Sequence, residues 1–142
     1  MFLVPRWPTY LWVMATIQRF EDLEIWQLGR ELAREMAEIT ESERWYRQYD
    51  LIDQIKRSSG SVPDNIAEGF ERDGNREFIQ YLSMAKGSCG ETRSQLYRAF
   101  DRKLITDEEF KQWQEKTLYL SAKIASFIRY LKNSENRGNK FK

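Results

Sequence analysis

The chain has 142 residues, of which 41% are hydrophobic and 32% are charged, a composition that suits one folded domain with a single core. Its 23 basic and 22 acidic residues leave a formal net charge of +1, so bulk charge points to neither a nucleic-acid nor a membrane partner. The chain has no histidine, which removes the commonest general base and metal ligand.

Residues 1–19 differ in composition from the rest, and we expect them to form an N-terminal extension or arm. They hold two prolines, two arginines and no acidic residue. The apolar stretch from Tyr10 to Ile17 is far shorter than the roughly 20 residues of a membrane span, and it lacks the small-residue cleavage site of a signal peptide. Met14 offers an alternative start of translation, which would place residues 1–13 outside the native protein.

The segment from residue 21 to about 43 has the spacing of an amphipathic helix. Its apolar residues recur every three or four positions, at Ile25, Leu28, Leu32, Met36 and Ile39. The other faces of this first helix are acidic, because residues 21–44 hold eight acidic and only three basic side chains.

The segment from about 47 to 72 keeps one helical register on both sides of Pro63. Its apolar and small positions are Ile52, Ile55, Ser59, Val62, Ile66 and Phe70. A proline inside a helix removes one hydrogen bond and clashes with the carbonyl four residues earlier. We therefore predict a single second helix that is kinked at Pro63.

A turn follows, in which Gly74 suits a C-terminal cap and Asn75 suits the N-cap of the next helix. That third helix, about 76–103, has its stripe at Phe78, Leu82, Ala85, Cys89, Thr92, Leu96 and Ala99. Thr106 and Glu109 form a capping box for a fourth helix that runs to about 132. The polar residues 133–142 are expected to be a disordered tail.

Four amphipathic segments joined by short turns, without a strand-period stretch, predict an all-α fold. We expect residues 20–132 to form one antiparallel up-down-up-down four-helix bundle. Two clusters of small residues, Ser58–Ser61 and Ala85–Gly90, interrupt the second and third helices. Because glycine costs about 1 kcal/mol relative to alanine inside a helix, we interpret their glycines as points where these two helices approach closely. A ligand cleft or a subunit contact is the alternative.

Several strings in the chain are recognisable together. They are Phe20–Gln27 (FEDLEIWQ), Gln54–Ser58 (QIKRS), Ser61–Gly69 (SVPDNIAEG), Glu77–Leu82 (EFIQYL) and Ala85–Ser88 (AKGS) with Glu91. With these strings, residues 20–132 resemble the bacterial four-helix-bundle proteins encoded within intervening sequences of 23S rRNA, also called S23-type ribosomal proteins. The most specific string marks Pro63, Asn65, Glu68 and Gly69 as family-motif residues with a structural role.

The resemblance implies partners as well as a fold. The same family includes the accessory variability determinant of diversity-generating retroelements, for which the resemblance implies a homopentamer that binds a reverse transcriptase and its RNA template. This chain departs from the family pattern at Cys89-Gly90 and Thr92-Arg93, which bears on the shared partner surface. The extra N-terminal segment favours Met14 as the start.

Residues with catalytic potential are few, and we expect no enzyme activity, cofactor, metal site or small-molecule substrate. Cys89, the single cysteine, lies on an apolar stripe, where we interpret it as a small buried hydrophobe. One cysteine also excludes an intramolecular disulfide and is typical of a reducing cytoplasm. Glu68 and Glu91 lie near apolar faces without a paired-carboxylate spacing or a phosphate loop, and Glu68 is expected to pair with a basic residue.

The acidic first helix hides a basic remainder, because residues from 45 onward hold 18 basic and 14 acidic side chains. The candidate nucleic-acid-binding residues are Lys56, Arg57, Arg72, Arg76, Lys86 and Arg93. Several phosphate contacts from such residues give salt-dependent affinity without sequence specificity. The alternative is an ordinary solvated surface with internal ion pairs.

We therefore interpret the chain as a non-enzymatic cytoplasmic scaffold that forms a homo-oligomer, by resemblance a pentamer, and binds RNA or an RNA-handling protein through a basic surface. Opposite charge on different helices favours head-to-tail contacts that close into a ring. Aromatic residues expected to be exposed and to anchor such contacts are Trp45, Tyr46, Tyr49, Tyr119 and Tyr130. The alternatives are a retroelement accessory protein that binds reverse transcriptase and template RNA, and a protein-interaction module without nucleic acid. No membrane association is expected.

Overall fold

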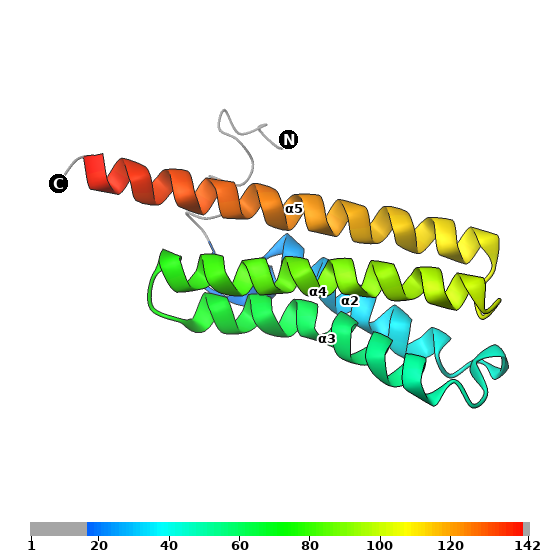
Figure 1. The fold of residues 1–142 in the computed structure, drawn as a ribbon. Helices are drawn as coiled ribbons and strands as arrows, with labels where there is room; N and C mark the ends of the chain where they lie inside the picture. The colour runs from blue at the N-terminus through cyan, green and yellow to red at the C-terminus, as the bar shows by residue number, and fades with distance from the viewer. Residues whose placement is uncertain (1–16, 141–142) are drawn as a thin grey trace, which may run out of the picture.

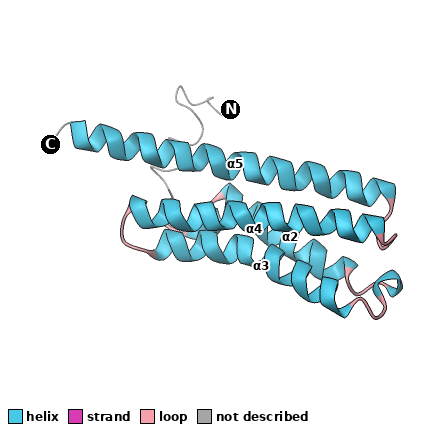
Figure 2. Cartoon of the chain, in the orientation of Figure 1, coloured by secondary structure: helices cyan, strands magenta, loops and turns pink. Residues whose placement is uncertain are grey.

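The computed structural model describes residues 17–140 (Figure 1), so residues 1–16 of the expected extension over residues 1–19, with the alternative start at Met14, lie outside the described residues. Within that range every regular element is a helix and none is a strand (Figure 2). The elements are the short 3₁₀ helices η1 (Phe20–Asp22) and η2 (Glu43–Trp45) and the long helices α2 (Glu24–Ile39), α3 (Tyr49–Glu71), α4 (Asn75–Asp101) and α5 (Asp107–Lys140). The predicted all-α fold with four long helices is confirmed.

Figure 1 shows the long helices side by side, each running opposite to the one before it in the chain. α3 packs against α2 on one side and against α4 on the other, and α4 in turn packs against α5. α2 and α5 complete the bundle, but they approach each other more sparsely. Because α2 contacts α3 and α5 rather than α4, it lies diagonally across the bundle from α4.

The predicted apolar stripes form the core. Fully buried side chains come from each long helix, as Met36, Ile55, Leu82 and Ile124 illustrate. The predicted stripe members that are only partly buried, and that pack against the margin of the core, are Leu28, Ile39, Ile52 and Phe70. The expectation that Trp45 is exposed is wrong, because η2 turns its indole inward and leaves it 1% exposed.

A hydrogen-bonded cluster of polar side chains lies inside this core, between α3 and α4. The hydroxyl of Ser58 donates to Oε1 of Gln95 at 2.6 Å and lies 2.8 Å from the hydroxyl oxygen of Thr92. All three residues are buried, at 3%, 4% and 0% exposure. Since buried polar groups are costly unless they are paired, this cluster fixes the register of the two helices.

Pro63 lies in the interior of α3, which continues through it as one helix, and it is buried. It faces Gly29 of α2, where a Cβ would lie 3.3 Å from the backbone nitrogen of Pro63 and 3.2 Å from Val62. The absent side chain of Gly29 therefore lets α2 approach α3 at the proline.

The small-residue clusters act differently from the prediction. An added Cβ would meet nothing within 4 Å at Gly60, Gly87 or Gly90, so none of these glycines is a point of close helix approach. The interpretation was wrong because the cluster's serines, rather than its glycines, face the neighbouring helix: Ser88 donates to Ser61 at 2.9 Å across α3 and α4. The glycines are turned outward.

The turns confirm one predicted cap and correct another. The amide of Thr106 donates to the Glu109 carboxylate at 2.8 Å and the Glu109 amide donates to the Thr106 hydroxyl at 3.1 Å, which confirms the capping box. Asn75 is not the N-cap of α4, because it is already the first helical residue and Gly74 takes that place. Gly74 has a φ of +110°, which glycine adopts without strain.

α5 extends to Lys140, so the predicted end of the fourth helix at about 132 is wrong, and the helix continues into the segment 133–142 that was expected to be a tail. Extending a helix that already exists adds one hydrogen bond per residue, which is easier than nucleating a new one. No proline stands in this stretch to stop it.

Candidate nucleic-acid interface

The six basic residues selected from the sequence do not lie on one surface. Two of them are engaged in ion pairs on α3 or at its end, because Arg57 contacts Asp53 at 2.8 Å and Arg72 contacts Glu68 at 2.8 Å. Lys56 precedes Pro63 by two helical turns, so it lies on the side of α3 that faces α2. These three residues are therefore separated from the other candidates.

Lys86 and Arg93 lie on the side of α4 that faces α5, and Arg76 lies farther round the helix toward solvent. They belong to two neighbouring lines of the helix surface, each with a seven-residue repeat. The first line is Ile79, Lys86, Arg93 and Phe100, and the second is Arg76, Ser83, Gly90 and Tyr97. Arg76 and Arg93 are 17 residues apart, which corresponds to about 25 Å along the helix axis.

The facing side of α5 carries two further cations. Its border with α4 is formed by Lys111, Leu118, Ala125 and Lys132 and, closer to the contact line, by Gln114 and Ser121. We call the surface defined by Arg76, Lys86, Arg93, Lys111 and Lys132 the basic seam. Figure 1 shows the two helices that carry it, α4 and α5, side by side.

Contacts between the two helices set their register along this boundary. The side-chain amide of Gln114 donates to the carbonyl oxygen of Arg93 at 3.4 Å, and the thiol of Cys89 donates to the carbonyl of Thr117 at 3.3 Å. The ring of Phe110 contacts that of Tyr97 with a centroid distance of 5.0 Å. Arg93 therefore lies beside Gln114, with Lys86 two turns away from it.

No Asp or Glu occupies the two lines on α4 or the Lys111 line on α5 within the described helices, whereas the Gln114 line begins with Asp107, the first residue of α5. Among the side chains of residues 17–134, moreover, no hydrogen bond or ion pair engages its five cations. The positive charge of the seam is thus not neutralised by the described part of the chain, unlike that of Arg57 and Arg72. An uncompensated row of cations attracts a polyanion such as a phosphate backbone.

Lys111 and Lys132 were not selected from the sequence. Both belong to the fourth amphipathic segment, whose mixed charges gave no reason to choose them. The seven-residue spacing of Lys111, the exposed Leu118 and Lys132 indicates that they share one face of the helix. The sequence does not tell that this face borders α4, because that depends on how α5 is rotated against α4.

The α2–α5 edge has the opposite character, because acidic residues of α2 meet basic residues of α5. Lys116 contacts Glu35 and, at 3.4 Å, Glu31, while the indole N–H of Trp113 donates to Glu35 at 2.7 Å. Burial alone raises the pKa of Glu35, but the hydrogen bonds from Lys116 and Trp113 and the charge of Lys116 hold that pKa below its ordinary value. The pKa of Lys116 is raised: burial lowers it, but Glu35 outweighs that effect.

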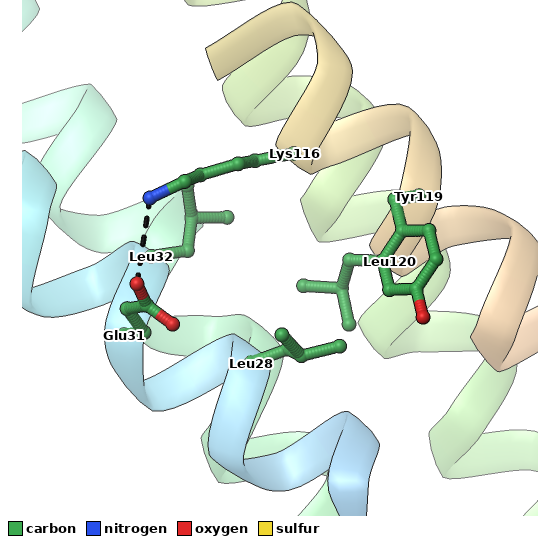
Figure 3. Close-up of a pocket in the computed structure, with 6 residues that line it drawn as sticks. All are labelled: Leu28, Glu31, Leu32, Lys116, Tyr119 and Leu120. Atoms are coloured by element: carbon green, nitrogen blue, oxygen red, sulfur yellow. Dashed lines mark hydrogen bonds and ion pairs between the residues drawn. The ribbon is translucent and has the colours of Figure 1, made fainter. Parts of the chain in front are cut away.

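Figure 3 shows a small cavity at this edge, with Lys116 of α5 reaching across to Glu31 of α2. The cavity is about 60 Å³ in volume. Its other lining residues are Leu28, Leu32, Tyr119 and Leu120. Ligand pockets usually measure roughly 300–1,000 Å³, so this cavity is too small for a typical substrate.

The family-motif residues make structural contacts. The amide of Asn65 donates to both the carbonyl and the hydroxyl of Ser61, each at 2.8 Å. Glu68 pairs with Arg72, as predicted, and this pairing holds the pKa of Glu68 below its ordinary value. Gly69 lies beneath Tyr81, and Pro63 is buried against Gly29.

The side chains with catalytic potential, Cys89 and Glu91, are buried or hydrogen-bonded. Cys89 is fully buried, which confirms its interpretation as a small hydrophobe, and burial raises the pKa of its thiol to about 11. The carboxylate of Glu91 accepts a hydrogen bond from Gln95 at 3.2 Å. In the part of the chain that the structure describes, no group of three or more acidic, cysteine or histidine side chains is placed to hold a metal ion. No helix there is long and apolar enough to cross a bilayer.

Comparisons with known proteins agree with the fold. The model of the 23S rRNA-intervening sequence protein family matches residues 21–126. A crystal structure of a protein with unknown function from the S23 ribosomal protein family of Bacteroides thetaiotaomicron is similar, with a TM-score of 0.68 and 21% sequence identity. The alignment covers 73% of this chain and 97% of that chain. No curated protein sequence matches the chain.

Proposed function

The chain belongs to the 23S rRNA-intervening sequence protein family, and from that premise we propose that it is a non-enzymatic, homo-oligomeric scaffold that binds RNA through its basic seam. The observation that carries the proposal is the seam itself. It places five cations on one face, without an acidic side chain among them and without an ion pair to the described residues. Such a surface binds a polyanion more readily than it binds an ordinary soluble protein.

The non-enzymatic part of the proposal is supported by the state of the reactive groups. The Cys89 thiol has a raised pKa and no exposed surface, so it lacks the thiolate that nucleophilic attack requires. The Glu68 carboxylate is exposed and held in an ion pair, and its lowered pKa does not suit a general acid or base near neutral pH. The cytoplasm is the proposed location, because it keeps a single thiol reduced.

Assembly into a homo-oligomer, by family resemblance a pentamer, is part of the same proposal. Outward-facing aromatic residues support it, since Tyr46 and Tyr49 are 70% and 71% exposed. Aromatic side chains are enriched in protein interfaces. Light scattering at micromolar concentration tests this part, and a strict monomer would exclude the ring.

A second candidate function is that of a retroelement accessory protein that binds a reverse transcriptase and its template RNA. The same seam favours it, because a partner that handles RNA and the RNA itself can share a basic surface. Co-purification with the reverse transcriptase encoded beside the gene would favour this candidate. A gene inside a 23S rRNA intervening sequence, without such an enzyme nearby, would favour the first.

RNA binding is tested by charge reversal on the seam. The triple variant Lys86→Glu, Arg93→Glu and Lys111→Glu should lower the affinity for a mixed-sequence RNA by roughly 100-fold at low salt. The control is Lys56→Glu, Arg57→Glu and Arg72→Glu, which makes the same change in net charge outside the seam. If both triples weaken binding equally, net charge rather than the seam determines affinity.

The salt dependence gives a second readout. Contacts with single-stranded phosphates change log K by about −0.7 per contact for each unit of log salt concentration. Full use of the five cations therefore gives a slope of about −3.5, and the seam triple should flatten it. Wild-type protein that fails to bind RNA at low salt would refute the RNA proposal, and an RNA-handling protein would then be the partner to seek.

A further inference from the structure

Tyr97 is an exposed aromatic residue on the basic seam. It is 53% exposed and follows Gly90 by two turns and Arg93 by one turn of α4. Lys111 lies next to Phe110, the residue of α5 that contacts Tyr97. Arg93 of α4 and Lys111 of α5 are therefore the seam cations closest to Tyr97 in the register of the two helices.

The ring of Tyr97 is braced from inside the bundle. Phe110 meets it edge to face, with a centroid distance of 5.0 Å and an interplanar angle of 76°. Phe110 is itself stacked on Phe100, with centroids 4.4 Å apart and an angle of 25°. Phe110, backed by Phe100, thus holds the ring of Tyr97 in place, and about half of the Tyr97 surface remains open to solvent.

Two other exposed tyrosines, Tyr119 and Tyr46, lack this combination. Tyr119 is 50% exposed, but its hydroxyl donates to Glu24 at 3.3 Å and its ring lies under Lys123 at the α2–α5 edge. Tyr46 is covered by the guanidinium of Arg47, 5.2 Å from its ring centroid. Tyr97 has no hydrogen bond or cation over its ring within the described residues.

We propose that the basic seam takes a single-stranded stretch of RNA and that one unpaired base stacks on the ring of Tyr97. This inference rests on the proposed RNA-binding function and adds the class of RNA. The cations of the seam contact the phosphates, while a π-face set among them suits a base of any sequence. In a duplex the bases are already stacked on each other, so Tyr97 has nothing to bind there.

The test measures the affinity of Tyr97→Ala and of Tyr97→Phe for two RNAs. One is a single-stranded oligouridine of roughly 15 nucleotides, and the other is its duplex with an oligoadenosine of equal length. Loss of the ring should weaken binding of the single strand by roughly 10-fold, because stacking one base contributes about 1–3 kcal/mol. Binding of the duplex and the salt slope should not change, since no charge is removed. Tyr97→Phe should retain the affinity because the π-face remains.

Tyr119→Ala is the matched control, an equally exposed tyrosine on the other edge of α5. Circular dichroism establishes whether each variant is folded. If Tyr97→Ala does not fold, the binding of Tyr97→Phe still tests the proposal. A competing thymidine oligonucleotide of equal length distinguishes DNA from RNA, and tighter binding of the DNA would overturn the assignment to RNA.

Two results would overturn the stacking role. The first is that Tyr97→Ala loses affinity for the single strand and for the duplex equally. The second is that Tyr97→Ala changes the mass of the oligomer without changing the RNA affinity, which would make Tyr97 a contact between subunits. If the seam charge reversal abolishes RNA binding while Tyr97→Ala binds normally, the proposed function stands and this inference fails. If wild-type protein binds no RNA, the proposed function itself fails.

Discussion

Gly69 of α3 lies directly beneath Tyr81 of α4, so close that a Cβ on the glycine would be 2.5 Å from the Cβ of the tyrosine. Phe78 would be 3.0 Å away on the same side. Because Cβ atoms are fixed to the backbone, a rotamer change of the tyrosine does not relieve this overlap. The contact ties the end of α3 to the start of α4, on either side of the Gly74 turn.

Gly69→Ala should therefore destabilise the protein. Alanine favours a helix over glycine by about 1 kcal/mol, but overpacking of a tight contact costs about 1–3 kcal/mol and requires the two helices to move apart. We expect a net loss of about 1 kcal/mol in the free energy of unfolding, measured by urea denaturation. A variant as stable as the wild type would mean that the helix ends separate easily.

Gly87→Ala is the matched substitution and should have the opposite sign. Gly87 is also helical, but nothing lies within 4 Å of its added Cβ. The free energy of unfolding should rise by about 1 kcal/mol from helix propensity alone, by the same measurement. A fall would indicate that this outward surface is covered, for instance by another subunit.

Ser58→Ala should cost about 1–3 kcal/mol of stability, because Gln95 and Thr92 would lose a buried partner. Urea denaturation of this variant gives the loss. The double variant Ser58→Ala with Gln95→Leu should recover part of it, since removing both polar partners avoids leaving one unpaired. If the double variant is no more stable than the single one, a packing defect rather than hydrogen bonding explains the loss.

Glu35→Gln should lower stability at pH 7 by about 1 kcal/mol, a modest value because Lys116 is partly exposed. The folded-state pKa of Glu35 is lowered, so its contribution is present above the unfolded pKa and is lost as the pH falls through the folded value. The difference in the free energy of unfolding between variant and wild type should therefore be smaller at about pH 3, which is below the ordinary glutamate pKa, than at pH 7. Urea denaturation at both pH values measures it, and a pH-independent difference would contradict the prediction.

Cys89 should resist thiol reagents in the folded protein. Its pKa of about 11 keeps the thiol protonated at pH 8, and its side chain has no exposed surface. Modification should proceed only as fast as the bundle opens, and it should become rapid in urea. Rapid labelling of the native protein would show that α4 and α5 separate readily.

Much of the fold could be predicted because its signals are local. The stripe through Ile55 and Val62 runs past Pro63 without a change of phase, and the helix does the same. The Glu68–Arg72 pair needs only a spacing of four residues. The capping box of Thr106 and Glu109 likewise depends on neighbours in the chain.

Features that depend on a second helix could not be predicted in this way. Gly29 and Gly87 are equivalent as sequence signals, yet one faces Pro63 and the other faces outward. The basic seam is the clearest case, because Arg93 and Lys111 become neighbours only through the rotation of α5 against α4. Arg57 was chosen for its charge, but Asp53 one turn earlier neutralises it.

The acidic α2 and the basic seam occupy opposite corners of the bundle, since α2 lies diagonally across from α4. A separation of this kind gives an almost neutral molecule a permanent electric dipole moment. In the field of a polyanion the molecule would turn before contact, presenting α4 and α5 first and trailing α2 behind. Orientation during approach would then raise the rate of productive encounters, most strongly at low ionic strength, although the net charge alone gives no such attraction.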